Sequence, residues 1–194
     1  KSAVKFMKQL GCLNDHSYAV CLNGAGVVRL SDYVKYDHHI GFPLVYKETF
    51  TGDRVKKITA FAHEHGCKVH GYSVTEGLVI EDHNPHTQRE IDNGFVGFKA
   101  IDFTKVPDTE EFFKLLIVGQ KETLDTVRAT LPEEFTSFFS VVRSEAHYLE
   151  FIPNHATKGT ALEHLCQALG YTKYNAIAFG DAENDLAMIK TAGL

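Results

Sequence analysis

Gly180-Asp181-Ala182-Glu183-Asn184-Asp185 follows an uninterrupted apolar run at residues 176–179 and precedes a helical pattern that begins at Leu186. An apolar run without polar alternation is typical of a parallel strand that is covered on both faces. Ligands of open α/β sheets bind at the carboxyl ends of such strands. The stretch therefore predicts a strand that delivers carboxylates and an amide to a ligand site.

A lysine lies one strand–helix unit upstream, in Thr157-Lys158-Gly159. Thr157 can cap a helix whose apolar residues recur at helical spacing until Gly170, a typical helix stop. Together, the lysine and the acidic cluster suggest a magnesium and phosphate site, because magnesium takes carboxylates plus substrate phosphate. Two alternatives stay open. Asn184 and Asp185 are also favoured at helix N-termini for capping alone, and most lysines are solvated surface charges.

Composition restricts the class of protein. The chain has 194 residues, 44% of them hydrophobic, which can supply a sizeable core. A net charge of −5 without a basic run argues against nucleic acid as a partner. Four widely separated cysteines form no CxxC pair, and no apolar stretch approaches the ~20 residues needed to span a membrane. We therefore expect a cytoplasmic protein.

The order of the expected elements predicts two domains. Residues 47–143 mix strands and helices with hairpin-like separations, unlike the alternating order that follows. We expect an α/β fold in which residues 1–46 and 144–194 form a core and residues 47–143 an inserted α+β domain. A central core strand is expected at 18–22, before a turn at Asn23-Gly24-Ala25-Gly26. The other expected strands are 68–72, 75–80, 112–118, 138–142 and 148–152, and the expected helices are 2–10, 51–66, 85–93, 122–129, 157–170 and 186–192.

These motifs, in this order, resemble the haloacid dehalogenase-like phosphatases, specifically the Cof-type branch with a type IIB cap, near the bacterial sugar-phosphate phosphatases. Ala156-Thr157-Lys158-Gly159 is similar to the family's third motif, and the Gly180–Asp185 stretch, extended by Leu186-Ala187-Met188, to its fourth. Leu22-Asn23-Gly24-Ala25 resembles the loop before the cap. Tyr148-Leu149-Glu150-Phe151 resembles the strand that returns from it.

The resemblance implies a Rossmann-like core, a capping domain and a magnesium-dependent phosphomonoester hydrolase acting on sugar phosphates or similar small metabolites. Lys158 would neutralise phosphoryl oxygens and anchor the nucleophile, and Asp181 would bind Mg²⁺. Asn184 would contact phosphate, while Asp185 would orient Lys158 or the metal's surroundings. By the same resemblance, Asn23 and Gly24 would border the phosphate pocket.

One departure from the family pattern concerns the nucleophile. Such phosphatases carry an Asp-x-Asp motif, whose first aspartate attacks phosphorus to form an aspartyl-phosphate, and then a Thr or Ser motif; neither motif occurs here. We expect both motifs upstream of Lys1; the alternative is a truncated, inactive protein. A phosphosugar mutase and a non-catalytic phosphosugar-binding protein also stay open. The oligomeric state is not predicted.

Histidines and aromatic residues offer two further hypotheses. A zinc site is conceivable at His63, His65 and His70 around Cys67, with His83 and His86 nearby. His63 and His65 are two apart at a helix end and point to different sides, so solvated histidines are favoured. The aromatic residues, which are Phe112, Phe113, Phe135, Phe138, Phe139 and Tyr148, could form a stacking platform, but packing of a small sheet is favoured.

Overall fold

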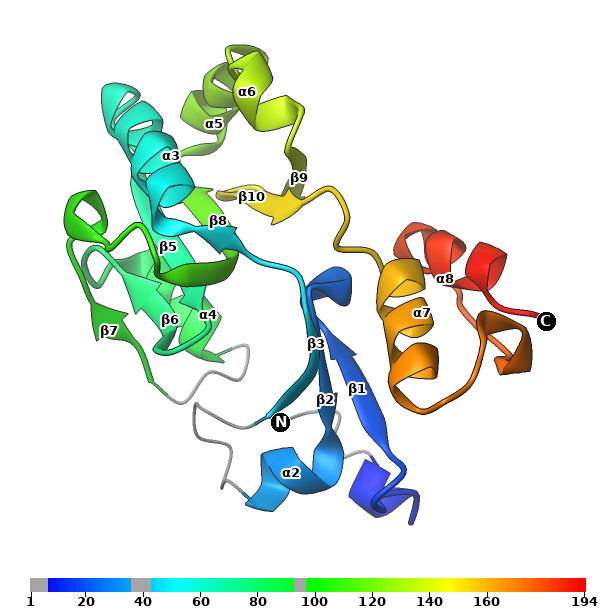
Figure 1. Ribbon diagram of the computed structural model, residues 1–194. Coiled ribbons are helices and arrows are strands. Elements are labelled where there is room, and N and C mark those ends of the chain that lie inside the picture. Colours follow the sequence, from blue (N-terminus) through cyan, green and yellow to red (C-terminus); the bar gives the residue numbers. More distant parts are fainter. Residues whose placement is uncertain (1–6, 36–42, 93–96) are drawn as a thin grey trace. The chain divides into compact units, whose positions relative to one another are not determined.

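The computed structural model describes residues 7–35, 43–92 and 97–194, and it divides the chain into two compact units (Figure 1). Unit 1 comprises Lys1–Glu48 and His155–Leu194, and unit 2 comprises Thr49–Asn154. Both units mix helices and strands. The predicted helix at residues 2–10 lies partly outside the described residues, and residues 7–9 are helical.

Unit 1 contains a three-stranded antiparallel sheet in the order β1-β2-β3, formed by β1 (Tyr18–Cys21), β2 (Gly26–Arg29) and β3 (Leu44–Lys47). A short 3₁₀ turn, η1 (Leu22–Gly24), joins β1 to β2, and α2 (Leu30–Lys35) follows β2. The strand predicted at residues 18–22 and the turn predicted after it are therefore confirmed. The predicted central position of the first strand is wrong for the described residues, because β1 pairs with β2 alone. Its exposed end at Cys21 is typical of an edge strand, whereas Val27 and Val28 of β2 are buried.

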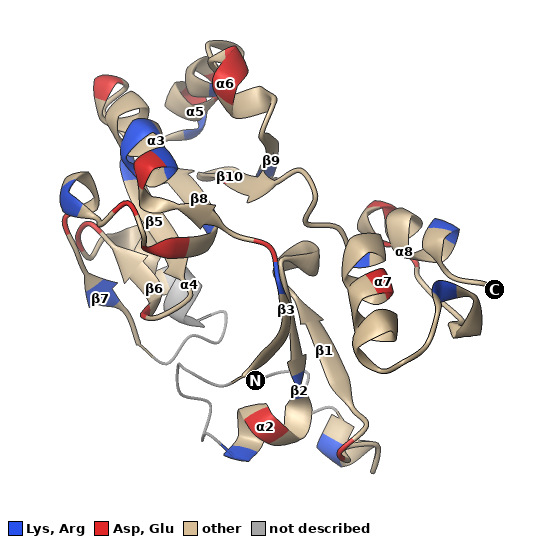
Figure 2. Cartoon of the chain, in the orientation of Figure 1, with Lys and Arg blue, Asp and Glu red and all other residues tan. Residues whose placement is uncertain are grey.

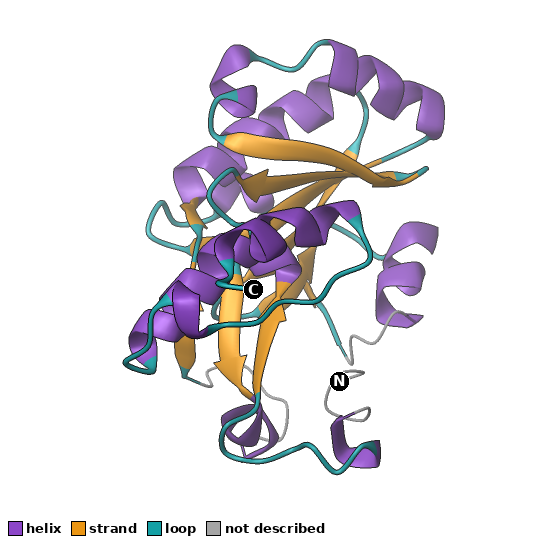
Figure 3. Cartoon of the chain, turned by 90° about the vertical axis from the view of Figure 1, so that its right-hand side faces the viewer, coloured by secondary structure: helices purple, strands orange, loops and turns teal. Residues whose placement is uncertain are grey.

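Helix α7 (Lys158–Ala168) lies across this sheet (Figures 1 and 3). The predicted cap is present, since the Thr157 hydroxyl accepts a hydrogen bond from the backbone N–H of Thr160 at 3.0 Å. The helix ends before Gly170, whose φ of +78° favours glycine. The rest of unit 1 consists of η3 (Lys173–Asn175), η4 (Glu183–Asp185) and α8 (Leu186–Thr191).

The predicted parallel strand at residues 176–179 is wrong for the described structure. These residues have no strand assignment, and Ile177 and Phe179 are 62% and 87% exposed. A strand forms only when its backbone N–H and C=O groups pair with a neighbouring strand. No strand among the described residues pairs with this segment.

Unit 2 is built on a seven-stranded sheet with the order β7-β6-β5-β8-β10-β9, with β4 joined to β8. All its strand pairs are antiparallel except β6 with β7. Helices α3, α5 and α6 cover one face of this sheet (Figure 1). The strands are β4 (Phe50–Thr51), β5 (Lys68–Ser73), β6 (Gly77–Ile80), β7 (Lys99–Ala100), β8 (Glu111–Val118), β9 (Phe139–Glu145) and β10 (Tyr148–Pro153). The helices are α3 (Gly52–Glu64), α4 (Pro85–Asp92), η2 (Phe103–Lys105), α5 (Lys121–Ala129) and α6 (Glu133–Thr136).

The expected ends of the inserted domain differ from the division of the structure. Its first boundary, expected at residue 47, lies at Thr49. Its second, expected at residue 143, lies at Asn154, because β10 pairs with both β8 and β9. Leu149 of β10 lies opposite Ile117 on one side and Arg143 on the other. Cutting the chain at residue 143 would split that three-strand ladder.

Aromatic side chains fill the interior between the sheet and helices of unit 2. Phe112 is fully buried, and Phe135 and Phe139 are at most 4% exposed. The rings of Phe50 and Phe139 meet edge to face, with centroids 4.9 Å apart. Such edge-to-face pairs add to the stabilisation from burial. The prediction that the aromatic residues pack a core is confirmed for Phe112, Phe135, Phe138 and Phe139, whereas Phe113 and Tyr148 are not members of this cluster.

Both acidic and basic residues occur on helices α3 and α5 of unit 2 (Figure 2). On α3, Lys57 pairs with Glu134 of α6 at 2.8 Å. Exposed pairs of this kind contribute little stability, about 0–1 kcal/mol each.

Within the described ranges, no helix combines the length and the apolar character needed to cross a membrane.

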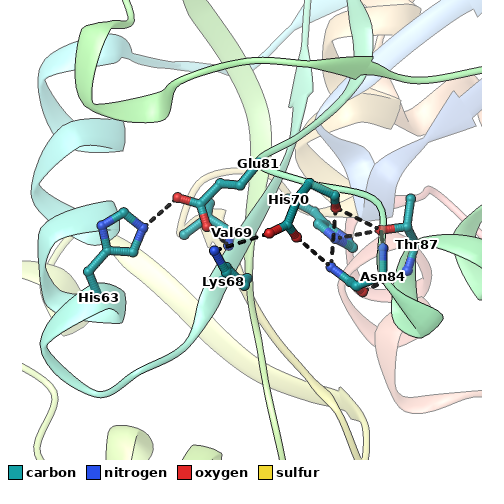
Figure 4. Close-up of polar contacts among 8 residues, drawn as sticks. His63, Lys68, Val69, His70, Glu81, Asn84 and Thr87 are labelled. Carbon is teal, nitrogen blue, oxygen red and sulfur yellow. Dashed lines mark hydrogen bonds and ion pairs between the residues drawn. The ribbon is translucent and has the colours of Figure 1, made fainter.

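Two histidines of unit 2, His63 and His70, have different partners (Figure 4). His63 lies 2.5 Å from a Glu81 carboxylate oxygen, and His65 contacts the Phe61 carbonyl. His70 is fully buried on β5, with Nε2 3.3 Å from the Thr87 hydroxyl. No group of three or more potential metal ligands occurs among the described residues, which leaves the zinc hypothesis without support there. The expectation of solvated histidines is wrong for His70.

The burial of His70 predicts a pH-dependent stability of unit 2. Burial in the sheet lowers its pKa from 6.5 to about 4, a shift to which nearby His86 contributes and which Asp82 opposes. As pH falls below 6.5, the unfolded chain gains the proton first, so stability is lost between pH 6.5 and about 4. The full loss amounts to about 3 kcal/mol. Urea unfolding followed across this pH range measures it.

Two variants isolate this contribution. His70→Phe removes the titrating group, so its unfolding free energy should fall less on acidification than that of the wild type. His83→Ala removes an exposed histidine of the same unit and should leave the wild-type pH dependence unchanged. Equal pH dependence of wild type and His70→Phe would contradict the assignment.

Candidate functional site

The centre of the candidate site is a contact between Lys158 and Asp185 in unit 1. Lys158 is the first residue of α7, and Asp185 ends the short turn η4. The Lys158 ammonium nitrogen lies 2.5 Å from Asp185 Oδ1, with the side chains 27% and 11% exposed. The contact brings together two residues far apart in sequence, both predicted as site residues.

The second oxygen of Asp185 binds the backbone of the loop at residues 180–185, called the acidic loop below. Oδ2 accepts hydrogen bonds from the backbone N–H groups of Asp181 at 3.4 Å and Ala182 at 3.3 Å. The Lys158 hydrogen bond is the largest cause that lowers the pKa of the Asp185 carboxyl, and these backbone N–H groups add to it. Asp185 is thus held ionised with both oxygens engaged. This arrangement suits a residue that orients Lys158 better than one that contacts substrate.

Helices α7 and α8 approach closely at Gly159. A Cβ at this residue would lie 2.6 Å from the Ala187 carbonyl oxygen and 2.7 Å from the Thr191 hydroxyl. Real Cβ atoms do not tolerate such distances, so only glycine permits this approach. Because Lys158 precedes Gly159 and Asp185 precedes α8, the same approach sets the distance between the two charged groups.

The η1 turn packs against the start of α7. Leu22 and Asn23 have positive φ angles of 51° and 56°, and Gly24 has a φ of 110°. Positive φ is uncommon for residues other than glycine, and such strain clusters at functional sites. A Cβ on Gly24 would overlap the carbonyl group of Thr157 and lie 2.8 Å from the backbone nitrogen of Lys158. Gly24 therefore allows the turn to touch the backbone that carries Lys158.

The turn also reaches the acidic loop through a side chain. Asn184 donates a hydrogen bond from Nδ2 to Asn23 Oδ1 at 3.3 Å. Both residues are exposed. Contacts within unit 1 therefore bring together the six residues singled out from the sequence. Lys158 contacts Asp185, and Asn184 contacts Asn23. Gly24 packs on the backbone at Lys158, and the Asp181 backbone N–H binds Asp185.

Gly159 is a positioning residue for which the sequence predicted no role. The signal was its place directly after Lys158 at the start of a helix, where a glycine lowers helix propensity and needs a packing reason. The strain at Leu22 carried no signal, since leucine is not typical of a left-handed backbone.

Asp181 is the candidate metal ligand, and it lies exposed in the acidic loop. Asp185 has both oxygens engaged, and no group of three or more potential ligands occurs among the residues that the structure describes. Asp181 can therefore supply one hard oxygen ligand. Mg²⁺ commonly takes one or two carboxylates, with water and substrate phosphate completing its shell. The described residues fit one position of such a shell.

Comparison with known proteins identifies the family. Residues 1–194 match the model of the haloacid dehalogenase-like hydrolases, so the chain belongs to this family, as its motifs predicted. The Streptococcus pyogenes protein M6_Spy0533 is 27% identical over 191 residues, which cover 96% of this chain. An Escherichia coli HMP-PP phosphatase is 25% identical over 194 residues, covering all of this chain. The chain spans only 66% of the length of each of these relatives.

Solved structures of the family share the fold. A haloacid dehalogenase-like hydrolase from Bacteroides thetaiotaomicron superposes with a TM-score of 0.77 at 25% identity, over 98% of this chain and 68% of that one. The subclass IIB sugar phosphatase BT4131 superposes with a TM-score of 0.66 at 15% identity, over 98% and 66%. The predicted α/β fold and the resemblance to the haloacid dehalogenase-like family are confirmed.

Proposed function

We propose that the protein is a phosphomonoester hydrolase in which unit 1 belongs to the catalytic core and unit 2 is the inserted cap. The observation that carries the proposal is the contact of Lys158 with Asp185, beside an amide and a free carboxylate on the same loop. Phosphoryl transfer rests on positioning and on neutralising charge at the phosphoryl oxygens. A held lysine and a metal-binding carboxylate offer both.

Each residue has a role in this proposal. Lys158 neutralises the phosphoryl oxygens and anchors the nucleophile, and Asp185 orients the Lys158 side chain. Asn184 donates an amide hydrogen to phosphate, with Asn23 and Gly24 at the pocket's border. Asp181 holds Mg²⁺, which when bound would supply further positive charge to the phosphoryl group.

The nucleophile in this proposal is an aspartate that forms an aspartyl-phosphate before water releases inorganic phosphate. The sequence of 194 residues contains no Asp-x-Asp motif to supply it, so we propose that it lies outside these residues. The substrate is a sugar phosphate or a similar small phosphorylated metabolite. The Escherichia coli relative is named an HMP-PP phosphatase and BT4131 a sugar phosphatase, and both names support phosphatase chemistry. We place the protein in the cytoplasm, consistent with its four separate cysteines.

The experiment that tests this function incubates the full-length protein with a panel of sugar phosphates and Mg²⁺, and follows both inorganic phosphate and isomerised sugar phosphate. Hydrolysis predicts phosphate release with multiple turnovers and no need for a bisphosphate activator. An isomer formed only with the activator would indicate the mutase. Saturable binding without turnover would indicate the non-catalytic binding protein.

A further inference from the structure

Asn23 has a more specific role than bordering a pocket. We propose that Asn23 is a positioning residue that fixes the side-chain amide of Asn184, so that one amide hydrogen of Asn184 stays directed to an anion. The inference rests on the proposed function, because the anion is the phosphoryl group of the substrate. It concerns a contact between two loops that come from opposite ends of the sequence.

The geometry gives the amide a defined orientation. Asn184 Nδ2 lies 3.3 Å from Asn23 Oδ1. A side-chain amide carries two hydrogens on nitrogen and an acceptor oxygen. When Asn23 accepts one hydrogen, the second is available to an anion. If the amide turned over, its carbonyl oxygen would face the Asn23 oxygen and the NH₂ group would leave the contact.

The backbone holds Asn23 at this place. Both Leu22 and Asn23 adopt left-handed angles, which are unfavourable for a residue with a side chain. Asparagine is among the residues that tolerate this conformation best. The turn is fixed on its other side by Gly24, which packs on the backbone of Thr157 and Lys158. The strained turn thereby joins the start of α7 to the acidic loop.

The test is a double-mutant cycle on the full-length protein with Asn23→Gly, Asn184→Ala and the combination. Glycine keeps the left-handed backbone but removes the acceptor oxygen. We expect Asn23→Gly to raise KM about fivefold and Asn184→Ala about twentyfold, with kcat changed less than twofold. The combined variant should match Asn184→Ala within about twofold, because Asn23 acts through Asn184.

A control and a second readout separate positioning from folding and from catalysis. Asn14→Gly, at an exposed turn of unit 1, should leave KM unchanged. In Asn23→Gly, the affinity for inorganic phosphate, measured without turnover, should fall as KM rises, and the NMR signals of the Asn184 NH₂ group should shift. If the wild type binds phosphate without hydrolysing substrate, the proposed function fails, while this binding cycle still tests Asn23.

Two outcomes would overturn the inference. The first is an additive cycle, in which Asn23→Gly raises KM or weakens phosphate binding equally with and without Asn184. The second is an Asn23→Gly variant whose phosphate affinity and Asn184 NH₂ signals equal those of the wild type.

Discussion

Replacing Lys158 by methionine should reduce kcat/KM for phosphate release about a thousandfold in the full-length protein, because one preorganised charge at a phosphoryl group contributes this much. The Lys158 nitrogen lies 2.5 Å from Asp185 Oδ1 and the side chain is 27% exposed, so the side chain is both held and partly accessible. Methionine keeps most of the length and removes the charge. Phosphate release at saturating Mg²⁺ measures the change.

A second lysine of unit 1 provides the matched control. Lys173 pairs with Glu163 at 3.0 Å and is 39% exposed. Glu163 is not one of the candidate site residues. Lys173→Met should keep kcat/KM within about twofold of the wild type, since exposed pairs contribute little. A loss smaller than tenfold in Lys158→Met would remove the lysine from the proposed chemistry.

Replacing Gly24 by alanine should lower the free energy of local unfolding of α7 by about 4 kcal/mol. Its φ of 110° costs a side chain about 1–2 kcal/mol. The added methyl group would also overlap the Thr157 carbonyl, and overpacking costs about 1–3 kcal/mol more. Hydrogen exchange of the α7 backbone amides measures the change. Activity should fall with it, because Lys158 lies on the displaced backbone.

Gly170 separates strain from collision. It also has a positive φ, of +78°, but an added Cβ there would meet nothing within 4 Å. Gly170→Ala should therefore cost only the conformational part, about 1–2 kcal/mol. If the two alanine variants lost equal stability, the close contact of the η1 turn with α7 would not be a determinant of the site.

Most elements could be predicted because their local signals agree with their surroundings. Thr157 caps α7 and Gly170 follows its end, as the capping pattern indicated. In unit 2, the apolar run of β8 and the pattern of α3 also lie where expected. The strand prediction at residues 176–179 failed because strand formation depends on pairing with other segments, which the local sequence does not reveal. The end of unit 2 was placed early for the same reason, since pairing of β10 with β8 is a long-range contact.

The residues of the candidate site could be predicted more readily than their contacts. Lys158 and Asp185 were singled out by motif and spacing, and the structure joins them. Gly159 could not be assigned a role, because the closeness of α7 and α8 depends on tertiary packing. The link from Asn23 to Asn184 spans most of the chain and has no periodic signal.

The proposal that the acidic loop and Lys158 form a metal-dependent phosphoryl-transfer site depends on Asp181 as a metal ligand. It is tested most directly by titrating Mg²⁺ into the full-length protein and its Asp181→Ala variant while inorganic phosphate is released from a sugar phosphate. We expect a saturable dependence on Mg²⁺ in the wild type and at least about a hundredfold lower activity in the variant. Equal activity of the two proteins, or release that persists after the metal is chelated, would contradict it.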